Sequence, residues 1–506
     1  MVLLMFLFPS GVRAVDDTGT VAGTVLDPSG AAVPSAAVTL KNTRTGTKTE
    51  TVSRAAGRFV FPAVRPGDYE LQVSRTGFQT RTVSGLRVTV GAQLSVRVPL
   101  ELGDVAQQVE VASDNVLVER ESISTSTVVN RALLDRMPLN GRSFQTLIEL
   151  APGVVIAPAS TGAPGQFSVN GQRTNSNYFT IDGVSANVDV AASFSFSQQA
   201  VGTLPAVNSF GGTGGMANVD AVEEFRIQTS TFAPEYGRMP GGQVSIVTRG
   251  GTNELHGSLF HYLRNEKLDA NNWFSNAAGL QRAPLRQNLF GFALGGPVFL
   301  PKFYDGRNRT FFFLTYEGQR LRLPRFQDVL VPTQEARQQA VAATRPLLNT
   351  FPLPNAPALP GALAFTGRYR AAYGDPGSAD VGAARIDHHF SPSLQTFFRA
   401  SISPSETAQR VFINQENAVL KRTDTYTGGL TWSINPRSLF DLRANFSGGT
   451  GDWNFEALPI GGAELLPAEA AFPAGSNLSL SNAVLSISLQ GFPNAINLSR
   501  GRVIRN

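Results

Sequence analysis

The chain has 506 residues, a formal net charge of +5 and only 16% charged residues. So small a charge over this length supports neither a nucleic-acid-binding stripe nor a polybasic membrane arm. With no cysteine, disulfides, thiol catalysis and thiolate metal sites are excluded, whereas 49 glycines and 34 phenylalanines favour turn-rich β structure.

The N-terminus reads MVLLMFLFPSGVRA, a short apolar run followed by helix breakers and a small residue. This pattern predicts a signal peptide over residues 1–14, cut after Ala14, although a basic start is missing. The alternative is a flexible apolar N-terminus of a soluble protein. No other segment approaches 18 uninterrupted apolar residues. A membrane would therefore be crossed only by a closed barrel, because only helices and barrels satisfy every backbone polar group in lipid.

Residues 18–101 alternate about seven strand patterns with Gly, Pro and Asp turns, which predicts a β-sandwich. Tyr69, Leu71 and Val73 fall on one face of their strand. The segments GTVLDPSGAAVPSAAVTL and PGDYELQVSRTGF resemble the carboxypeptidase regulatory-like domain, a prealbumin-like sandwich with a carbohydrate-binding-like fold. We expect no peptidase chemistry, because this unit contains no His, and no Trp platform supports sugar binding.

Residues 121–249, which follow an extended linker at 102–120, mix short helices with strands. Apolar spacing predicts a helix over 130–137, and Ser143 is expected to cap a second short helix. Glu223 and Glu224 are expected to start a third, where negative charge suits the N-terminus. The expected strands and long loop are these: 167–170, 178–181, 225–228 and 244–248, with the loop at 185–218.

Four blocks of sequence, in order over most of residues 15–320, carry a family resemblance. They are RMPLNGRSFQTLIELAPGV, NGQRTNSNYFTIDGVSANVD, the stretch that starts VEEFRIQTSTFAPEYGRMPGGQVSIVTRGGTNELHG, and RQNLFGFALGGPVF with RTFFFLTYEGQR. They resemble the plug and early barrel of TonB-dependent outer-membrane receptors, in the Oar-like group with a carboxypeptidase regulatory-like domain in front. The resemblance implies an α+β plug domain at 121–249 inside a transmembrane antiparallel β-barrel that begins at 250.

The resemblance also implies that a set of plug residues serves as structural turns and docking contacts. They are Arg142, Asn170, Gly171, Gln172, Arg173, Asp182, Gly183, Glu223, Glu224, Glu235, Tyr236, Gly237, Arg238, Gly241, Gly242 and Arg249. Ion pairs between the plug and the wall would suit a plug that must move, because the charged groups can exchange each other for water at a low net cost in free energy. For Glu235, Arg238 and Arg249, ordinary surface charge is the alternative.

Receptors of this family pair a short extended box with the energy-coupling protein by strand addition. Val109, Glu110, Val111 and Ala112, within the linker, resemble such a box. A last sandwich strand or a first plug strand is the alternative for these residues.

Residues 250–506 alternate apolar and polar side chains in segments of about 10 residues, as in a membrane barrel wall. Phe398 and Ile402 lie on the apolar face, and Phe397 is an exception on the polar one. A soluble sandwich would also alternate. Short turns at 391–392 and 435–436 contrast with polar stretches at 404–422 and 449–478, which are expected to be outer loops.

The expected wall strands lie near 254–264, 286–296, 309–319, 382–390, 393–403, 423–434 and 438–448. Plugged transporters have about 22 strands, so the chain is expected to be a gene fragment that stops inside the barrel. His256 and His261 are expected on opposite faces of one strand. Asp387 and His389 share a face, where we expect a hydrated pair or, alternatively, a contact with a cation or substrate.

The overall expectation is a mainly β, non-enzymatic transporter of the outer membrane with its N-terminal domain in the periplasm. No catalytic, cofactor or metal site and no nucleic-acid partner is expected. The resemblance implies a TonB-type partner, outer-membrane lipid around the wall, and a metal chelate, saccharide or peptide as substrate. The alternatives are a surface or adhesion protein anchored by the barrel, and a secreted carbohydrate-binding β protein.

Overall fold

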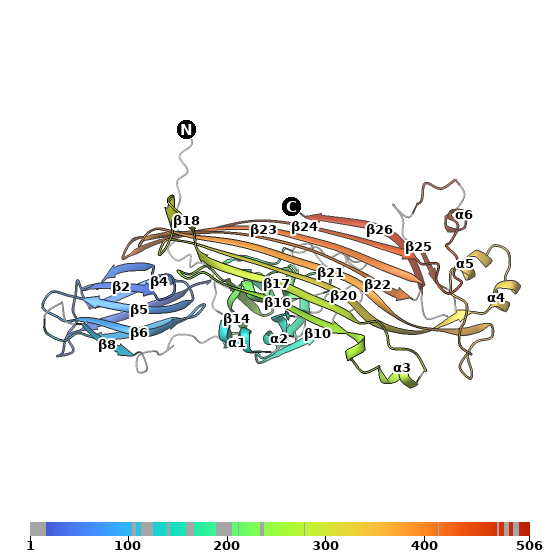
Figure 1. The fold of residues 1–506 in the computed structure, drawn as a ribbon, viewed down its shortest axis with the longest axis horizontal. Coiled ribbons are helices and arrows are strands. Elements are labelled where there is room, and N and C mark those ends of the chain that lie inside the picture. The colour runs from blue at the N-terminus through green and yellow to red at the C-terminus, as the bar shows by residue number, and fades with distance from the viewer. Residues whose placement is uncertain are drawn as a thin grey trace.

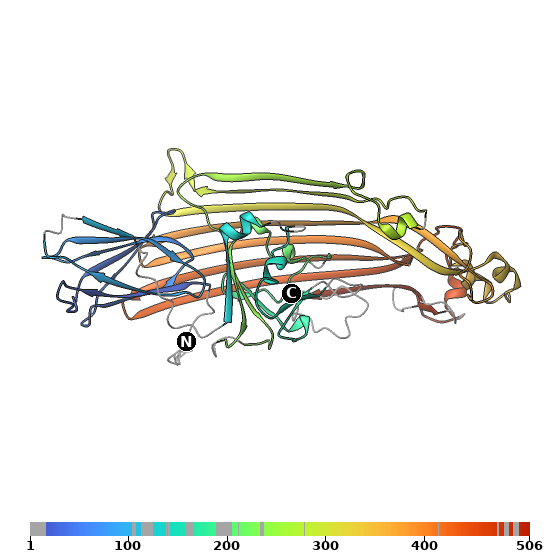
Figure 2. The ribbon, with the colours of Figure 1, turned by 90° about the horizontal axis from the view of Figure 1, so that it is seen from below.

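The structure is a computed structural model. It describes residues 17–103, 108–112, 125–137, 139, 142–157, 166–188, 205–210, 212–232, 237–277, 279–412, 414–472, 475–479, 485–488 and 495–505. The predicted signal peptide, Glu235 and Tyr236 lie outside these residues. A sandwich lies at one end of a long sheet, and a smaller plug packs against one face of that sheet (Figures 1 and 2).

The N-terminal unit is the predicted sandwich of two facing sheets. One sheet has the order β4-β1-β7 and the other β3-β2-β5-β6-β8. Tyr69, Leu71 and Val73 are buried in the core between them, because alternate residues of a strand face the same side. The strands are β1 (Gly19–Leu26), β2 (Ala37–Asn42), β3 (Lys48–Val52), β4 (Arg58–Val64), β5 (Gly67–Ser74), β6 (Thr80–Val88), β7 (Gln93–Pro99) and β8 (Gln108–Ala112).

The residues of the possible coupling box form β8, the outer strand of the second sandwich sheet. Val109 and Val111 lie opposite Arg81 and Val83 of β6, in a parallel pairing. The structure therefore places this segment as the last sandwich strand, the alternative stated above.

The plug is built on a five-stranded sheet with the order β13-β12-β15-β14-β9. Aromatic and branched side chains of this sheet pack against two short helices in one core. The elements are β9 (Thr125–Asn130), α1 (Arg131–Arg136), α2 (Gln145–Ile148), β12 (Tyr178–Ile181), β13 (Val184–Ser185), β14 (Val222–Ser230) and β15 (Gln243–Thr248), with a hairpin of β10 (Val154–Ala157) and β11 (Gln166–Val169) beside them.

The helix at 130–137 is confirmed, since the Asn130 side chain caps α1 by accepting a hydrogen bond from the backbone N–H of Leu133. The prediction for Ser143 is wrong, because Phe144 occupies the N-cap position of α2. Phe144 is fully buried, with its ring 5.5 Å from that of Phe225. The residue at the N-cap therefore contributes a ring to the plug core and makes no side-chain capping bond.

The helix expected at Glu223 and Glu224 is also wrong, because both residues lie in strand β14. The element directly before this strand is a short 3₁₀ turn, Val219–Ala221. β14 pairs with β15 on one side and β9 on the other. Backbone hydrogen bonds on both edges of a central strand outweigh the local charge signal for a helix start.

The wall is an open antiparallel sheet with the order β16-β17-β20-β21-β22-β23-β24-β26-β25. All seven predicted wall strands are present. The two predicted short turns join β21 to β22 and β23 to β24. The wall elements are β16 (His256–Asn265), β17 (Arg286–Pro297), β20 (Thr310–Pro332), β21 (Thr366–Ser391), β22 (Leu394–Phe412), β23 (Gln415–Asn435), β24 (Ser438–Ala457), β25 (Leu485–Ser488) and β26 (Ala495–Arg505).

Short elements connect or flank the wall strands, several of them at the end away from the sandwich (Figure 1). They are α3 (Trp273–Ala277), β18 (Phe299–Leu300), β19 (Tyr304–Asp305), α4 (Gln334–Gln339), α5 (Arg345–Asn349) and α6 (Ala468–Ala471). Over the residues that the structure describes, no helix is both long and apolar enough to cross a membrane.

Four wall strands, β20, β21, β23 and β24, are 20 residues or longer, so the predicted loops at 404–422 and 449–478 are partly wrong. Most of 404–422 continues β22 and β23 in register, with Thr407 opposite Val419, and β24 extends to Ala457. There Ser405 and Thr407 face inward while Glu406 faces outward. A strand with two polar faces carries no alternation in hydropathy, so its pattern imitates a loop.

The two faces of the wall differ as predicted. Leu314, Ile386, Phe398 and Trp432 are exposed on the outer face. Phe397, the exception, is buried on the inner face, toward the plug and the sandwich. The histidines of β16 also divide as expected, with His256 beside Phe313 inside and His261 beside Phe290 outside.

Candidate functional site

The plug meets the wall at Asp182, which lies in the turn after β12. Its carboxylate accepts hydrogen bonds from the backbone N–H of Thr248 (2.9 Å) and from the Thr248 hydroxyl (2.7 Å). Two wall guanidiniums approach it, Arg385 at 3.1 Å and Arg399 at 3.7 Å. Burial alone would raise the pKa of Asp182, but the two cations and the Thr248 donors hold it below its ordinary value.

Arg385, on β21, binds several partners at once. It donates to the Thr248 hydroxyl of the plug (2.7 Å) and to both carboxylate oxygens of Asp387 (3.0 Å). Asp387 is also ion-paired with Arg65 of the sandwich. We call Asp182, Thr248, Arg385, Asp387 and Arg399 the Asp182 cluster. All five residues are buried, so removing one charge would leave the others less well neutralised away from water.

Phe397 lies at the centre of the cations around this cluster. The Arg385 guanidinium carbon is 4.1 Å from the ring centroid, and those of Arg443 and Arg65 are at 5.4 and 6.0 Å. A guanidinium over an aromatic face is attracted by the ring quadrupole. The aromatic residue on the polar face thus has a physical role, because it packs against charges that come from two parts of the chain.

A second contact joins the plug to the wall at Arg142. Its guanidinium lies 2.9 Å from Glu317 of the wall and 2.7 Å from Asp220 of the plug, and 4.0 Å from the ring centroid of Phe260. Burial alone would lower the pKa of Arg142, but the two carboxylates raise it above its ordinary value. We call Arg142, Asp220 and Glu317 the Arg142 cluster.

The plug strand β14 also contacts the sandwich. Glu223 lies 3.1 Å from Arg44 and 3.8 Å from Arg249. Glu224 accepts a hydrogen bond from the backbone N–H of Val90, and Arg87 is 3.8 Å away. Burial raises the pKa of Glu224 to about 7, because the low-polarity surroundings disfavour the ionised form.

This pKa predicts that docking of the sandwich on the plug depends on pH. A carboxyl whose pKa is raised on docking stabilises the docked state below its ordinary pKa of 4.5 and loses that stabilisation as the pH rises through about 7. Cleavage of the linker by added protease should therefore increase from about pH 5 to about pH 8. The cleavage rate of Glu224→Gln should stay at the parent's low-pH value over the whole pH range. The cleavage rate of the exposed control Glu101→Gln should rise with pH as it does in the parent. Equal pH profiles for the parent and Glu224→Gln would contradict the assignment.

Other predicted site residues form turns rather than contacts with the wall. Asn170 and Gly171, like Asp182 and Gly183, adopt positive φ angles. Gly241 packs so closely on the backbone of Ser176 that a Cβ would lie 2.6 Å from its carbonyl oxygen. The further members of this group are placed as follows: Gly242 donates to Asn177, Arg238 lies over the Tyr178 ring, and Gln172, Arg173 and Gly237 are exposed.

The wall and sandwich partners of the plug were not identified from the sequence. Asp387 is not the hydrated residue that was expected, because it is buried between Arg385 and Arg65, and this prediction is wrong. His389 instead packs edge-on against Phe311, with ring centroids 6.4 Å apart. Among the described residues, no group of three His, Cys, Asp or Glu side chains is arranged to hold a metal ion.

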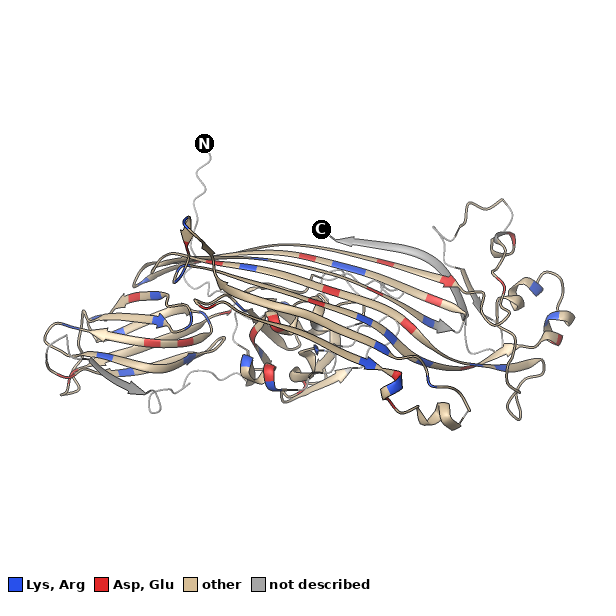
Figure 3. Cartoon of the chain, in the orientation of Figure 1, with Lys and Arg blue, Asp and Glu red and all other residues tan. Residues whose placement is uncertain are grey.

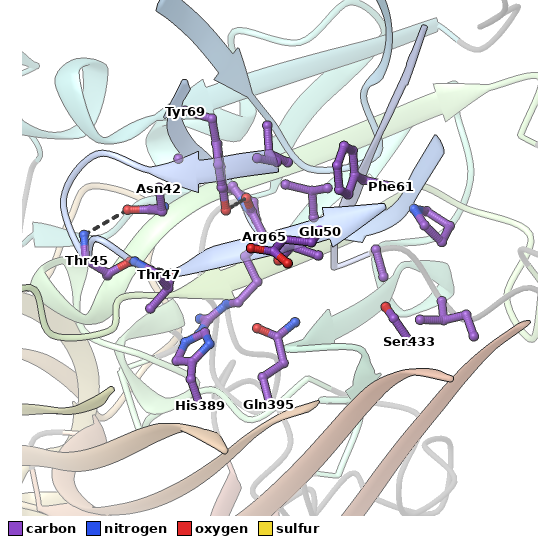
Figure 4. Close-up of a pocket in the computed structure, with 18 of the residues that line it drawn as sticks. Asn42, Thr45, Thr47, Glu50, Phe61, Arg65, Tyr69, His389, Gln395 and Ser433 are labelled. Atoms are coloured by element: carbon purple, nitrogen blue, oxygen red, sulfur yellow. Dashed lines mark hydrogen bonds between the residues drawn. The ribbon is translucent and has the colours of Figure 1, made fainter. Parts of the chain in front are cut away.

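A cavity of about 510 Å³ lies between the sandwich, the plug and the wall (Figure 4). Arg65 and Tyr69 line it from the sandwich side, and His389, Gln395 and Ser433 line it from the wall. Charged residues occur in all three parts of the chain (Figure 3). Thr248 and Asp387 of the Asp182 cluster also line this cavity, so the cavity and that cluster belong to one joint where sandwich, plug and wall meet, whereas the Arg142 cluster does not line it.

Three family models match the chain in domain order. They are described as Carboxypeptidase regulatory-like domain (residues 20–101), TonB-dependent Receptor Plug Domain (118–243) and Outer membrane beta barrel domain (247–346 and 338–502). The chain is 27% identical over 318 residues to the TonB-dependent transporter Oar of Myxococcus xanthus, which covers 58% of this chain and 27% of Oar.

Two solved structures resemble the chain weakly. The outer membrane transporter YddB from Escherichia coli has a TM-score of 0.43 at 11% identity and covers 66% of this chain and 40% of that one. The siderophore receptor PirA from Acinetobacter baumannii has a TM-score of 0.38 at 14% identity, with 67% and 46% covered. The chain thus spans about a quarter of the curated relative and less than half of these two structures.

Proposed function

Because this chain belongs to the TonB-dependent outer-membrane receptors, in the Oar-like group with a carboxypeptidase regulatory-like domain in front, we propose that it is the plug-gated part of an energised transporter. The protein resides in the outer membrane. Its relatives are transporters and receptors, and we assign it no catalytic role. Metal chelates, saccharides and peptides are the candidate substrates, which would bind the outer loops and the plug.

The observation that carries this proposal is the chemistry of the contact between plug and wall. The Asp182 and Arg142 clusters join the two parts through ion pairs and hydrogen bonds. A contact made by apolar packing alone would expose a hydrophobic surface to water whenever the plug moved. Charged groups can instead be rehydrated when the contact opens, so a pull on the plug exchanges buried pairs for water rather than exposing a hydrophobic core.

We further propose that a periplasmic TonB-type protein supplies this pull through residues 109–112. Strand addition uses backbone hydrogen bonds, and proline removes a backbone donor. Val109→Pro with Val111→Pro should therefore abolish binding of the full-length protein to the C-terminal domain of its TonB-type partner, measured by calorimetry. The matched pair Val109→Thr with Val111→Thr, which keeps both donors, should bind like the parent. Undiminished binding by the proline variant would remove the coupling role from this segment.

A further inference from the structure

The sandwich touches the plug through the turn between β6 and β7. Arg226 of β14 donates to the carbonyl oxygen of Gly91 at 2.9 Å, and Glu224 accepts from the backbone N–H of Val90. Both plug side chains are buried, with exposed fractions of 5% and 0%. Both contacts join a plug side chain to a main-chain partner in a water-poor interface, and the bond donated by the Arg226 guanidinium is charge-assisted and therefore strong.

The sandwich touches the wall at the same time. The carbonyl oxygen of Arg44 accepts from the backbone N–H of Asn253 (3.1 Å), and that of Thr45 accepts from its side-chain amide (2.6 Å). Arg65 forms the ion pair with Asp387 described above. The sandwich thus contacts both the plug, which is the proposed gate, and the wall against which the plug packs.

Two glycines of the sandwich lie directly against side-chain ends of the plug and the wall. A Cβ on Gly91 would lie 2.1 Å from a guanidinium nitrogen of Arg226, and a Cβ on Gly46 would lie 2.1 Å from the side-chain oxygen of Asn308. Both glycines also have positive φ angles. By contrast Gly30, at φ +84°, has no atom within 4 Å of its would-be Cβ. Gly30 therefore provides the same backbone strain without a docking contact.

We propose that the sandwich is a second closure of the transporter. It acts as a cap that binds both the plug and the wall, and it must detach before the cavity between sandwich, plug and wall opens. This inference rests on the proposed gating function. The cap and the coupling segment are linked, because β8 is a strand of the sandwich. A partner that takes β8 by strand addition would pull on the cap before it pulls on the plug.

A reversible cross-link tests the cap, because the chain has no cysteine of its own. The hydrogen bonds from Asn253 to the carbonyl oxygens of Arg44 and Thr45 bring residues 45 and 253 together, so these two positions are chosen for the cysteines. In the full-length protein, Thr45→Cys with Asn253→Cys would be combined with Arg385→Ala, which releases the plug from the wall. The leak of a large antibiotic through the outer membrane should appear in reductant and be lost when the disulfide forms.

The outcomes separate the cap from the gate. A leak that persists in the oxidised protein, with the disulfide shown to form by gel mobility, overturns the cap and leaves the gate intact. No leak from Arg385→Ala even in reductant would instead contradict the gate itself. A second variant does not depend on the disulfide: Gly91→Ala should speed protease cleavage within residues 102–120, while Gly30→Ala should not. Equal cleavage of these two variants would also overturn the cap.

Discussion

Arg385→Ala is expected to open the gate without substrate. The substitution strands Asp182 and Asp387 in a buried site with fewer cations around them. Breaking a buried ion pair by removing one partner costs about 3–5 kcal/mol. The full-length variant, produced in a Gram-negative host, should admit a large antibiotic that the intact outer membrane excludes. Growth inhibition by that antibiotic measures the effect.

The matched control is Arg320→Ala on the neighbouring strand β20. Arg320 pairs with Asp380 at 3.1 Å, but its side chain is 46% exposed on the outer face. Exposed pairs contribute about 0–1 kcal/mol, so this variant should exclude the antibiotic like the parent. If Arg385→Ala were as resistant as Arg320→Ala, the Asp182 cluster would have no part in closing the lumen.

Arg142→Ala is expected to have the second largest effect. It leaves Glu317 of the wall without its 2.9 Å partner and removes a cation from Asp220. Hydrogen bonds to charged groups contribute about 1.5–3 kcal/mol, so a loss of about 2–3 kcal/mol is expected. Thermal unfolding of the plug in the purified protein should shift to lower temperature, while the exposed Arg136→Ala on α1 should leave it unchanged.

The pair can be tested for direct coupling. Glu317→Gln removes the carboxylate that Arg142→Ala would strand, so the double variant should be more stable than the sum of the two single effects predicts. Strict additivity would show that Arg142 acts on the plug by another route than its contact with the wall.

The fold follows from local patterns where those patterns are distinctive. Alternation with period two located the sandwich core at Tyr69 and the apolar outer face of the wall at Phe398. The period-two pattern failed for the C-terminal part of β22, where Glu406 and Thr407 make both faces polar. It failed again at Glu224, because a central strand in a buried sheet overrides a helix-start signal.

For a similar reason, the sequence predicted only the plug side of the candidate site. Motifs pointed to Asp182 and Arg142 on the plug, but their partners come from the wall, where only the strand register decides which residues meet. Arg385 and Asp387, two apart on one strand, share a face by simple geometry. Nothing local shows that Asp182 would lie against them. Phe397 was the available signal, since an aromatic ring on a polar face needs a partner.

The most direct test of the gate is a reversible bond between plug and wall. The backbone N–H of Ser209 in the plug donates to the Ser405 hydroxyl of β22 at 2.9 Å, so these neighbouring positions are chosen for a cysteine pair that changes the side-chain size little. Ser209→Cys with Ser405→Cys, combined with Arg385→Ala in the full-length protein, should be impermeable to the large antibiotic when oxidised and leaky when reduced. A leak of equal size in both states, with the disulfide formed, would contradict the proposal that movement of the plug away from the wall opens this protein.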